Sequence, residues 1–259
     1  MEKFLKMFGF CLAGLFLFGA VSYGETVKII AEDDWYPYSA SIDGGAKGIA
    51  VDIVSAVYKA EGIDVEFQPM NYDRGMALVK DGSAVGCFDT SRTKELEQDY
   101  LWHDEPMFAA TSMFYASADS TGNVNSVNDL AGKTLGLTQG YSYGDKIDLN
   151  KGIDKEYSKS DEVILKKLVA KRVDYVIVFE KVADSLVTKL NLQGKIRPAG
   201  KSETTMIYVS FSKTHPQGKK YCDLFSEGFR KIKADGTYQK LMDQWDAKLK
   251  GAAPEPVSK

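Results

Sequence analysis

The sequence is poor in the residues that most often build metal and redox centres. It has 2 histidines, His103 and His215, and 3 cysteines among 259 residues. The two histidines lie far apart and match neither the H-E-x-x-H motif nor a cysteine-rich metal-binding spacing. We therefore expect neither a metal site nor a cofactor.

An excess of basic residues is also lacking. The chain carries 33 Lys and Arg against 36 Asp and Glu, and no basic stripe runs along it. Nucleic-acid binding depends on clustered cations that neutralise phosphates. The charge balance therefore argues against nucleic acid as a partner.

Long apolar runs are confined to the N-terminus. Lys3 and Lys6 precede an apolar run from residue 7 to about residue 21, and the small residues Ser22 and Gly24 follow. This pattern predicts a secretory signal peptide over residues 1–24, because the run is too short to span a membrane. Cys11 lacks the surroundings of a lipoprotein cleavage site, so we expect a free periplasmic product.

The mature chain of about 235 residues is long enough for two compact lobes. It retains Cys87 and Cys222. Two cysteines cannot form a disulfide scaffold, and the sequence leaves open whether they pair.

Segments typical of strands and helices alternate along the chain, which predicts an α/β fold. We expect strands at residues 26–31, 64–69, 83–88, 133–137 and 173–179. We expect helices at residues 48–61, 72–80, 161–171 and 217–248, the last broken at Gly236. Two more strand-like stretches, 107–116 and 206–212, flank the middle series. Such an arrangement suits a chain that crosses from one lobe to another and returns.

The stretch LTQGYSYGD at residues 137–145 breaks a strand at Gly140, and we expect a helix from about Ser142. A helix that opens directly after a strand has free N–H groups and a partial positive charge, so it can bind an anion. The phosphate-loop spacing is missing, which favours a small carboxylate. The alternative is a plain strand-to-helix turn capped by Ser142.

Several motifs together resemble one family, the extracellular solute-binding proteins of the polar amino-acid type, which feed ABC importers. The matching segments are W-x-P-Y at 35–38, G-I-A-V-D-I at 48–53, V-K-D-G at 79–82, T-S-R-T at 90–93, D-L-A-G-K-T-L-G-L at 129–137, K-R-V-D-Y-V-I at 171–177 and A-D-G-T-Y-x-x-L-x-x-x-W at 234–245. Each motif alone is weak evidence for the family, but the motifs occur in the expected order and together cover nearly the whole mature chain.

The resemblance implies a type II periplasmic-binding-protein fold, in which two lobes joined by two hinge strands close on a ligand. We expect lobe 1 to comprise residues 25–113 and 208–251, lobe 2 residues 114–207, and a flexible tail residues 252–259. The implied partners are a small-molecule ligand, polar or cationic, and an ABC permease. A monomer is expected.

The resemblance also assigns ligand-binding residues in lobe 1. Glu32, Trp35 and Tyr72 match an acid and two aromatics that contact the ligand side chain. The segment with Asp89, Thr90 and Arg92 matches the one that contacts the α-amino and α-carboxylate groups.

In lobe 2, the resemblance assigns Thr138, Tyr141, Ser142 and Tyr143 to the loop whose amides complete the grip on the carboxylate. The acid expected to bind the amine falls at Phe179, but the sequence has Glu180 one position later. A shift of one residue turns a strand side chain to the other face, unless a bulge intervenes. We assign the amine to Glu180, because a dehydrated ammonium needs a carboxylate.

The family arginine that binds the carboxylate is expected near Leu96 or Glu97, and neither is basic. Arg92 is the candidate replacement, since a guanidinium matches a carboxylate with two parallel hydrogen bonds. Arg74 is a second candidate, and a solvated surface charge is the alternative role for Arg92.

These features predict a non-enzymatic solute-binding protein that delivers an amino acid to an importer. Two alternatives stay open. One is a secreted dehydratase-like enzyme that uses Glu180, Arg92 and His103. The other is a sensing module that signals through a receptor.

Overall fold

The computed structural model describes residues 24–252, so the expected signal peptide (apart from Gly24) and the tail beyond Ala252 lie outside the described residues. The elements in order are β1 (Thr26–Glu32), β2 (Asp34–Trp35), β3 (Ser39–Ile42), β4 (Gly45–Lys47), α1 (Ile49–Ala60), β5 (Asp64–Met70), α2 (Tyr72–Asp81), β6 (Gly86–Ser91), β7 (Tyr100–Trp102), β8 (Phe108–Ser117), the 3-10 helix η1 (Val127–Leu130), β9 (Thr134–Thr138), α3 (Asp145–Asp148), β10 (Asp154–Ser158), α4 (Asp161–Val169), β11 (Tyr175–Phe179), α5 (Glu180–Lys189), β12 (Ile196–Ser212), α6 (Gly218–Ala234) and α7 (Thr237–Ala252).

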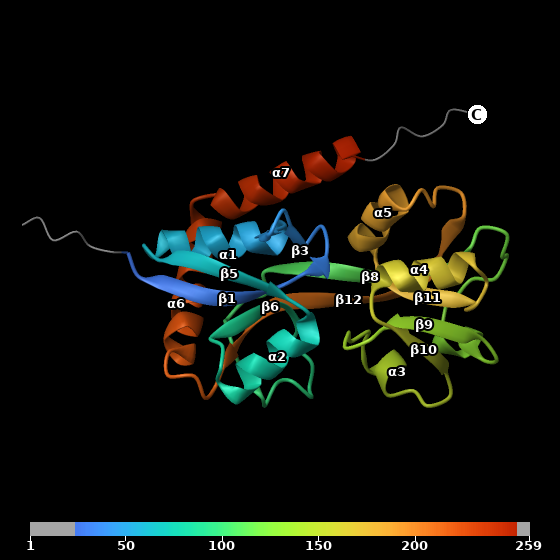
Figure 1. Ribbon diagram of the computed structural model, residues 1–259, viewed down its shortest axis with the longest axis horizontal. Coiled ribbons are helices and arrows are strands. Elements are labelled where there is room, and N and C mark those ends of the chain that lie inside the picture. Colours follow the sequence, from blue (N-terminus) through green and yellow to red (C-terminus); the bar gives the residue numbers. More distant parts are fainter. Residues whose placement is uncertain (1–23, 253–259) are drawn as a thin grey trace, which may run out of the picture.

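Two long strands connect two groups of elements (Figure 1). The main sheet has the order β10-β9-β11-β8-β12-β6-β1-β5, with β7 paired to β12. The strands β8 and β12 are antiparallel and pair from Ile196–Ser117 to Ile207–Phe108. On one side, β1 pairs parallel to β5 and β6, and on the other, β9 pairs parallel to β10 and β11. The α/β architecture expected from the sequence is confirmed.

The first group, here called lobe 1, packs helices α1, α2, α6 and α7 around β1, β5 and β6 (Figure 1). Helix α6 buries Tyr221, Phe225 and Phe229 on its inner face, at helical spacing. A Cβ on Gly228 would lie 2.4 Å from the backbone oxygen of Val57, so α6 crosses α1 there with no room for a side chain. The expected break between the last two helices is confirmed at Gly236, whose φ is +81°.

The second group, lobe 2, contains β9, β10 and β11 with α3, α4 and α5 (Figure 1). Helix α4 begins as the sequence predicts, because the Ser160 side chain accepts a hydrogen bond from the Val163 amide. Its buried Ile164, Leu165 and Leu168 face the sheet core. The exact residues at which the chain passes between lobes stay a prediction.

Several expected elements differ in extent. The strand expected at 83–88 is β6, three residues later, and the strand expected at 206–212 is the end of the longer β12. The helix expected from Ser142 is wrong: residues 139–144 form an irregular loop, and α3 has only four residues. Side-chain hydrogen bonds to Asp148, described below, hold this loop. Strand β10 was not predicted, because its sequence DKEYS lacks an alternation of apolar and polar residues, and helix α5 was not predicted either.

The two mature cysteines are free and buried, Cys87 in β6 and Cys222 in α6. The open question of their pairing is thereby answered for this structure. Within residues 24–252, no helix is long and apolar enough to cross a membrane, and no group of three or more candidate metal ligands occurs.

Candidate ligand-binding cleft

A cavity of about 170 Å³ lies between the lobes. Its lobe 1 side, here called the first wall, is lined by Glu32, Trp35, Tyr72, Asp73, Met76, Asp89, Ser91 and Leu96. Its lobe 2 side, the second wall, is lined by Gly140, Tyr141, Ser142 and Phe179. The first wall is built at the ends of β1 and β6 and the start of α2, a usual place for ligands in open α/β sheets.

Asp89 is the most exceptional residue of the cavity. It lies in β6 with a positive φ of +65°, an uncommon conformation for a residue other than glycine. The residue is 6% exposed, and neither carboxylate oxygen has a hydrogen-bond partner in the structure. Burial raises the pKa of Asp89 well above its usual range. An unpartnered buried carboxylate that faces a cavity costs stability and is suited to bind a cation.

Glu32, at the end of β1, is 4% exposed. Its Oε1 accepts a short hydrogen bond from the Tyr141 hydroxyl, which joins the two walls. Burial, and next the charge of Asp89, raise the pKa of Glu32 well above its usual range. The pKa of Tyr141 is raised in turn by burial and by Glu32, so Tyr141 remains a donor.

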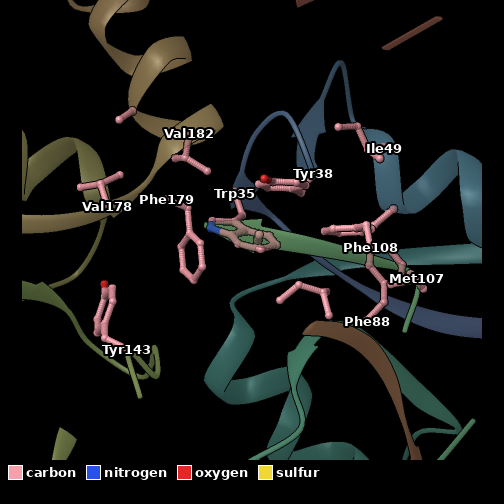
Figure 2. Packing of buried hydrophobic residues seen from close by; sticks show 14 of the residues in the cluster. Trp35, Tyr38, Ile49, Phe88, Met107, Phe108, Tyr143, Val178, Phe179 and Val182 are labelled. Atoms are coloured by element: carbon pink, nitrogen blue, oxygen red, sulfur yellow. The ribbon is translucent and has the colours of Figure 1, made fainter. Parts of the chain in front are cut away.

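Aromatic rings close the cavity from both lobes. The Trp35 ring lies 4.3 Å from Tyr38 and 5.0 Å, edge on, from Phe179 of the second wall. Figure 2 shows Trp35 between these two neighbours. The Tyr72 and Tyr141 rings meet at 6.0 Å and 90°. The Trp35 ring is therefore packed between its neighbours and also lines the cavity.

The loop 139–144 is held by side chains rather than by a helix. The Ser142 hydroxyl donates to Asp148 at 2.7 Å, and the Tyr143 amide donates to the same carboxylate at 3.0 Å. The Asp73 carboxylate lies directly against Gly140, since a Cβ built there would be 1.9 Å from Asp73 Oδ1. The turn in which Ser142 caps a helix is therefore not formed, and an acid of lobe 1 already approaches the loop.

Thr138, at the end of β9, and Tyr143, within this loop, do not line the cavity. The Thr138 amide donates to the Tyr143 hydroxyl at 3.0 Å, and the Thr138 hydroxyl donates to the buried Asp161. Thr90 is likewise buried, with its hydroxyl 3.2 Å from that of Ser210. Thr90, Thr138 and Tyr143, which the resemblance assigned to the ligand, therefore pack behind the walls of the cavity and support them.

Arg92 is placed outside the cavity. Its guanidinium Nε donates to Glu97 at 2.7 Å, with a second, shorter bond from Nη2, and it stacks on Trp102 and Tyr208 at 5.8 and 5.9 Å. The structure therefore corresponds to the alternative role, a surface charge, because the guanidinium forms two hydrogen bonds with an exposed carboxylate five residues along the chain. Arg74 is exposed and does not line the cavity either.

Glu180 also lies outside the cavity. It is the exposed first residue of α5, and Phe179, at the end of β11, lines the cavity in its place. No bulge intervenes in β11, whose register with β8 is continuous from Tyr175 to Phe179. The one-residue shift therefore turns Glu180 away from the ligand side, as strand periodicity requires.

Sequence reasoning missed Asp73, Met76, Ser91, Leu96 and Phe179 as lining residues. Asp73 follows Tyr72 directly at the start of α2, which was the available signal. A further acid, Asp161 at the start of α4, is 3% exposed, and burial raises its pKa to about 7. Its position in lobe 2 adds a second buried carboxylate near Glu32, whose pKa it helps to raise.

His103 is a core residue. It is 1% exposed, its Nε2 accepts a hydrogen bond from the Val209 amide at 3.0 Å, and its ring lies 4.4 Å from Phe225. Burial lowers the pKa of His103 to about 3, so the ring is neutral at physiological pH. None of the three residues considered for an enzyme, Glu180, Arg92 and His103, lines the cavity.

Comparison with known proteins decides the family. The model of the bacterial extracellular solute-binding proteins, family 3, matches residues 27–248. The chain belongs to this family. The family assignment made from the motifs is thereby confirmed.

Two curated members are similar over most of the chain. The arginine-binding extracellular protein ArtP of Bacillus subtilis is 23% identical over 82% of this chain and 82% of its own. A "Probable histidine-binding protein" of Campylobacter jejuni is 19% identical over 95% and 99%. Among solved structures, a histidine kinase sensor domain with similarity to periplasmic binding proteins has a TM-score of 0.78 at 18% identity, covering 86% of this chain and 96% of that one. The periplasmic-binding-protein fold is thereby confirmed.

Proposed function

We propose that this family 3 protein captures a small ammonium-bearing solute, an amino acid or a related molecule, in the cavity between its lobes and delivers it to an ABC importer. One observation carries the proposal: Asp89 is buried in the cavity without a hydrogen-bond partner, next to Glu32. A buried carboxylate is stabilised when a ligand supplies an ammonium group. The proposed ligand contacts are Glu32, Trp35, Tyr72, Asp89, Tyr141 and Ser142, with Thr90, Thr138 and Tyr143 in supporting positions.

The relatives support a cationic ligand. ArtP is named for arginine and the Campylobacter protein for histidine. In this chain, the aromatic rings of Trp35 and Tyr72 beside two acids form a suitable surface for a positively charged group.

A thermal-shift screen over the standard amino acids and simple amines, followed by calorimetry, tests the proposal. We expect one-to-one binding without turnover, and stabilisation by at least one cationic solute. Absence of stabilisation by every amino acid and every amine would refute capture of an ammonium-bearing solute. Formation of product in the same mixtures would instead establish an enzyme.

Sensing is the second candidate, and the similarity to a histidine kinase sensor domain favours it. In both roles the cleft closes on the same ligand, so binding alone does not separate them. The two roles are separated by reconstituting a permease with the liganded protein and measuring the ATPase activity of the permease. Ligand-dependent stimulation of permease ATPase supports import, and no stimulation by any candidate permease supports sensing.

A further inference from the structure

We propose that the ligand of this cavity is a small organic amine without a carboxylate group. This inference rests on the proposed capture of an ammonium-bearing solute and specifies its class. It follows from the acidic side chains that line the cavity and from the positions of the basic side chains outside it.

The charged side chains that line the cavity are all acidic. Glu32, Asp73 and Asp89 line it, and within residues 24–252 no lysine, arginine or histidine does. Asp89 has two oxygens without a hydrogen-bond partner, so its carboxyl group is available to a cation. A ligand carboxylate would enter beside three acidic side chains and meet no cation, so its desolvation would not be offset.

The two groups that a carboxylate would need are occupied or remote. Arg92 forms two hydrogen bonds with Glu97 and lines a neighbouring groove, which meets the cavity at Ser91 and Ser142, but it does not line the cavity itself. The loop at Gly140, the expected half of an anion site, is approached instead by the Asp73 carboxylate. A free carboxylate placed there would displace Asp73 or be repelled by it.

The remaining surface suits an organic cation. Trp35, Tyr72, Tyr141 and Phe179 line the cavity with aromatic rings, and their faces attract ammonium and guanidinium groups. The volume of about 170 Å³ is below the roughly 300–1,000 Å³ of cavities that hold drug-sized ligands, so the amine is small.

Calorimetry with matched pairs tests the inference: agmatine and arginine, cadaverine and lysine, histamine and histidine. The two members of a pair differ only by the carboxylate. We expect at least one amine to bind one-to-one and at least tenfold more tightly than its parent amino acid. Equal or tighter binding of the amino acid in every pair would overturn the inference while the proposed function stands. No binding by any of these amines or by any standard amino acid would overturn both.

The variant Asp89→Asn locates the site. Asparagine keeps the shape and tolerates a positive φ, so the fold is expected to persist. Affinity for the bound amine should fall about 30-fold or more, because a buried charge pair loses one partner. Asp223→Asn, which removes an exposed acid paired with Lys219 on α6, is the matched control and should leave affinity unchanged. If Asp89→Asn does not fold, Glu32→Gln serves the same purpose, and unchanged affinity in the folded variant would overturn the inference.

Discussion

The two walls of the cleft contribute different kinds of group. The first wall carries all three carboxylates that line the cavity, Glu32, Asp73 and Asp89, whereas the second wall presents Gly140, Tyr141, Ser142 and Phe179 and no charge. Closing the lobes therefore brings an aromatic and hydroxyl-bearing surface onto an acidic one. The charged side chains of the cavity lining come from lobe 1, and lobe 2 adds aromatic surface and the hydrogen bond from Tyr141 to Glu32.

This division differs from the expectation that both lobes supply charged side chains to the ligand. That expectation needed Arg92 on one side and Glu180 on the other. The structure places both outside, so the second wall offers no acid for an ammonium and the first offers no cation for a carboxylate. The predictions below test this difference between walls, from the largest effect to the smallest.

Trp35 is the most deeply packed of the residues through which the walls touch, so its removal should have the largest effect. It is 2% exposed and packs on Tyr38 and Phe179. Trp35→Ala should lower the free energy of unfolding by about 3–5 kcal/mol and abolish ligand binding. Urea unfolding measures the first effect. Trp102→Ala, on β7 outside the cavity, is the control, and a similar loss of binding there would argue against a special role for Trp35.

The buried acid of lobe 2 should make stability depend on pH. Burial raises the pKa of Asp161 to about 7 in the folded state, from about 3.8 when unfolded. Between these values the folded chain binds more protons, so stability falls as pH rises through this window, by at most about 1.4 kcal/mol per pH unit for one proton.

Urea unfolding of the wild type and of Asp161→Asn at several pH values from 4 to 8 measures this contribution. The stability of the wild type relative to the variant should decrease as pH rises. A constant difference would show that Asp161 ionises in the fold as it does in the unfolded chain.

The hydrogen bond between the walls should influence closure. Tyr141→Phe removes the donor to Glu32 while keeping the ring that contacts Tyr72. The free energy that favours the closed arrangement of the lobes should decrease by about 1–2 kcal/mol, because a hydrogen bond to a carboxylate group is removed. Small-angle scattering should show a larger radius of gyration without ligand. Tyr157→Phe, at an exposed position of β10, should change nothing.

Arg92 should have the smallest effect on binding. Because it pairs with Glu97 at the surface, Arg92→Ala should lower stability by about 0.2–1 kcal/mol. Ligand affinity should change less than threefold. A loss of affinity of 30-fold or more would restore Arg92 to the site and contradict the difference between the walls.

The sequence predicted much of the scaffold. The period of apolar residues located α1, α4 and the pair α6 and α7, because helices that cover a sheet need one apolar face. The joint order of motifs identified the family, and with it the two hinge strands. The resemblance to the family assigned Glu32, Trp35 and Asp89 to the ligand site, and all three line the cavity, where strand ends meet at one edge of the sheet.

What the sequence by itself determined is therefore the family, the α/β fold and the set of acids and aromatics available to the cleft. Only the tertiary structure decided which of these side chains face the cavity. Arg92 and Asp89 are three residues apart in the chain, yet one is paired with Glu97 at the surface and the other is buried without a partner. Their difference depends on backbone conformation and on neighbours brought from other elements, which local sequence patterns do not encode.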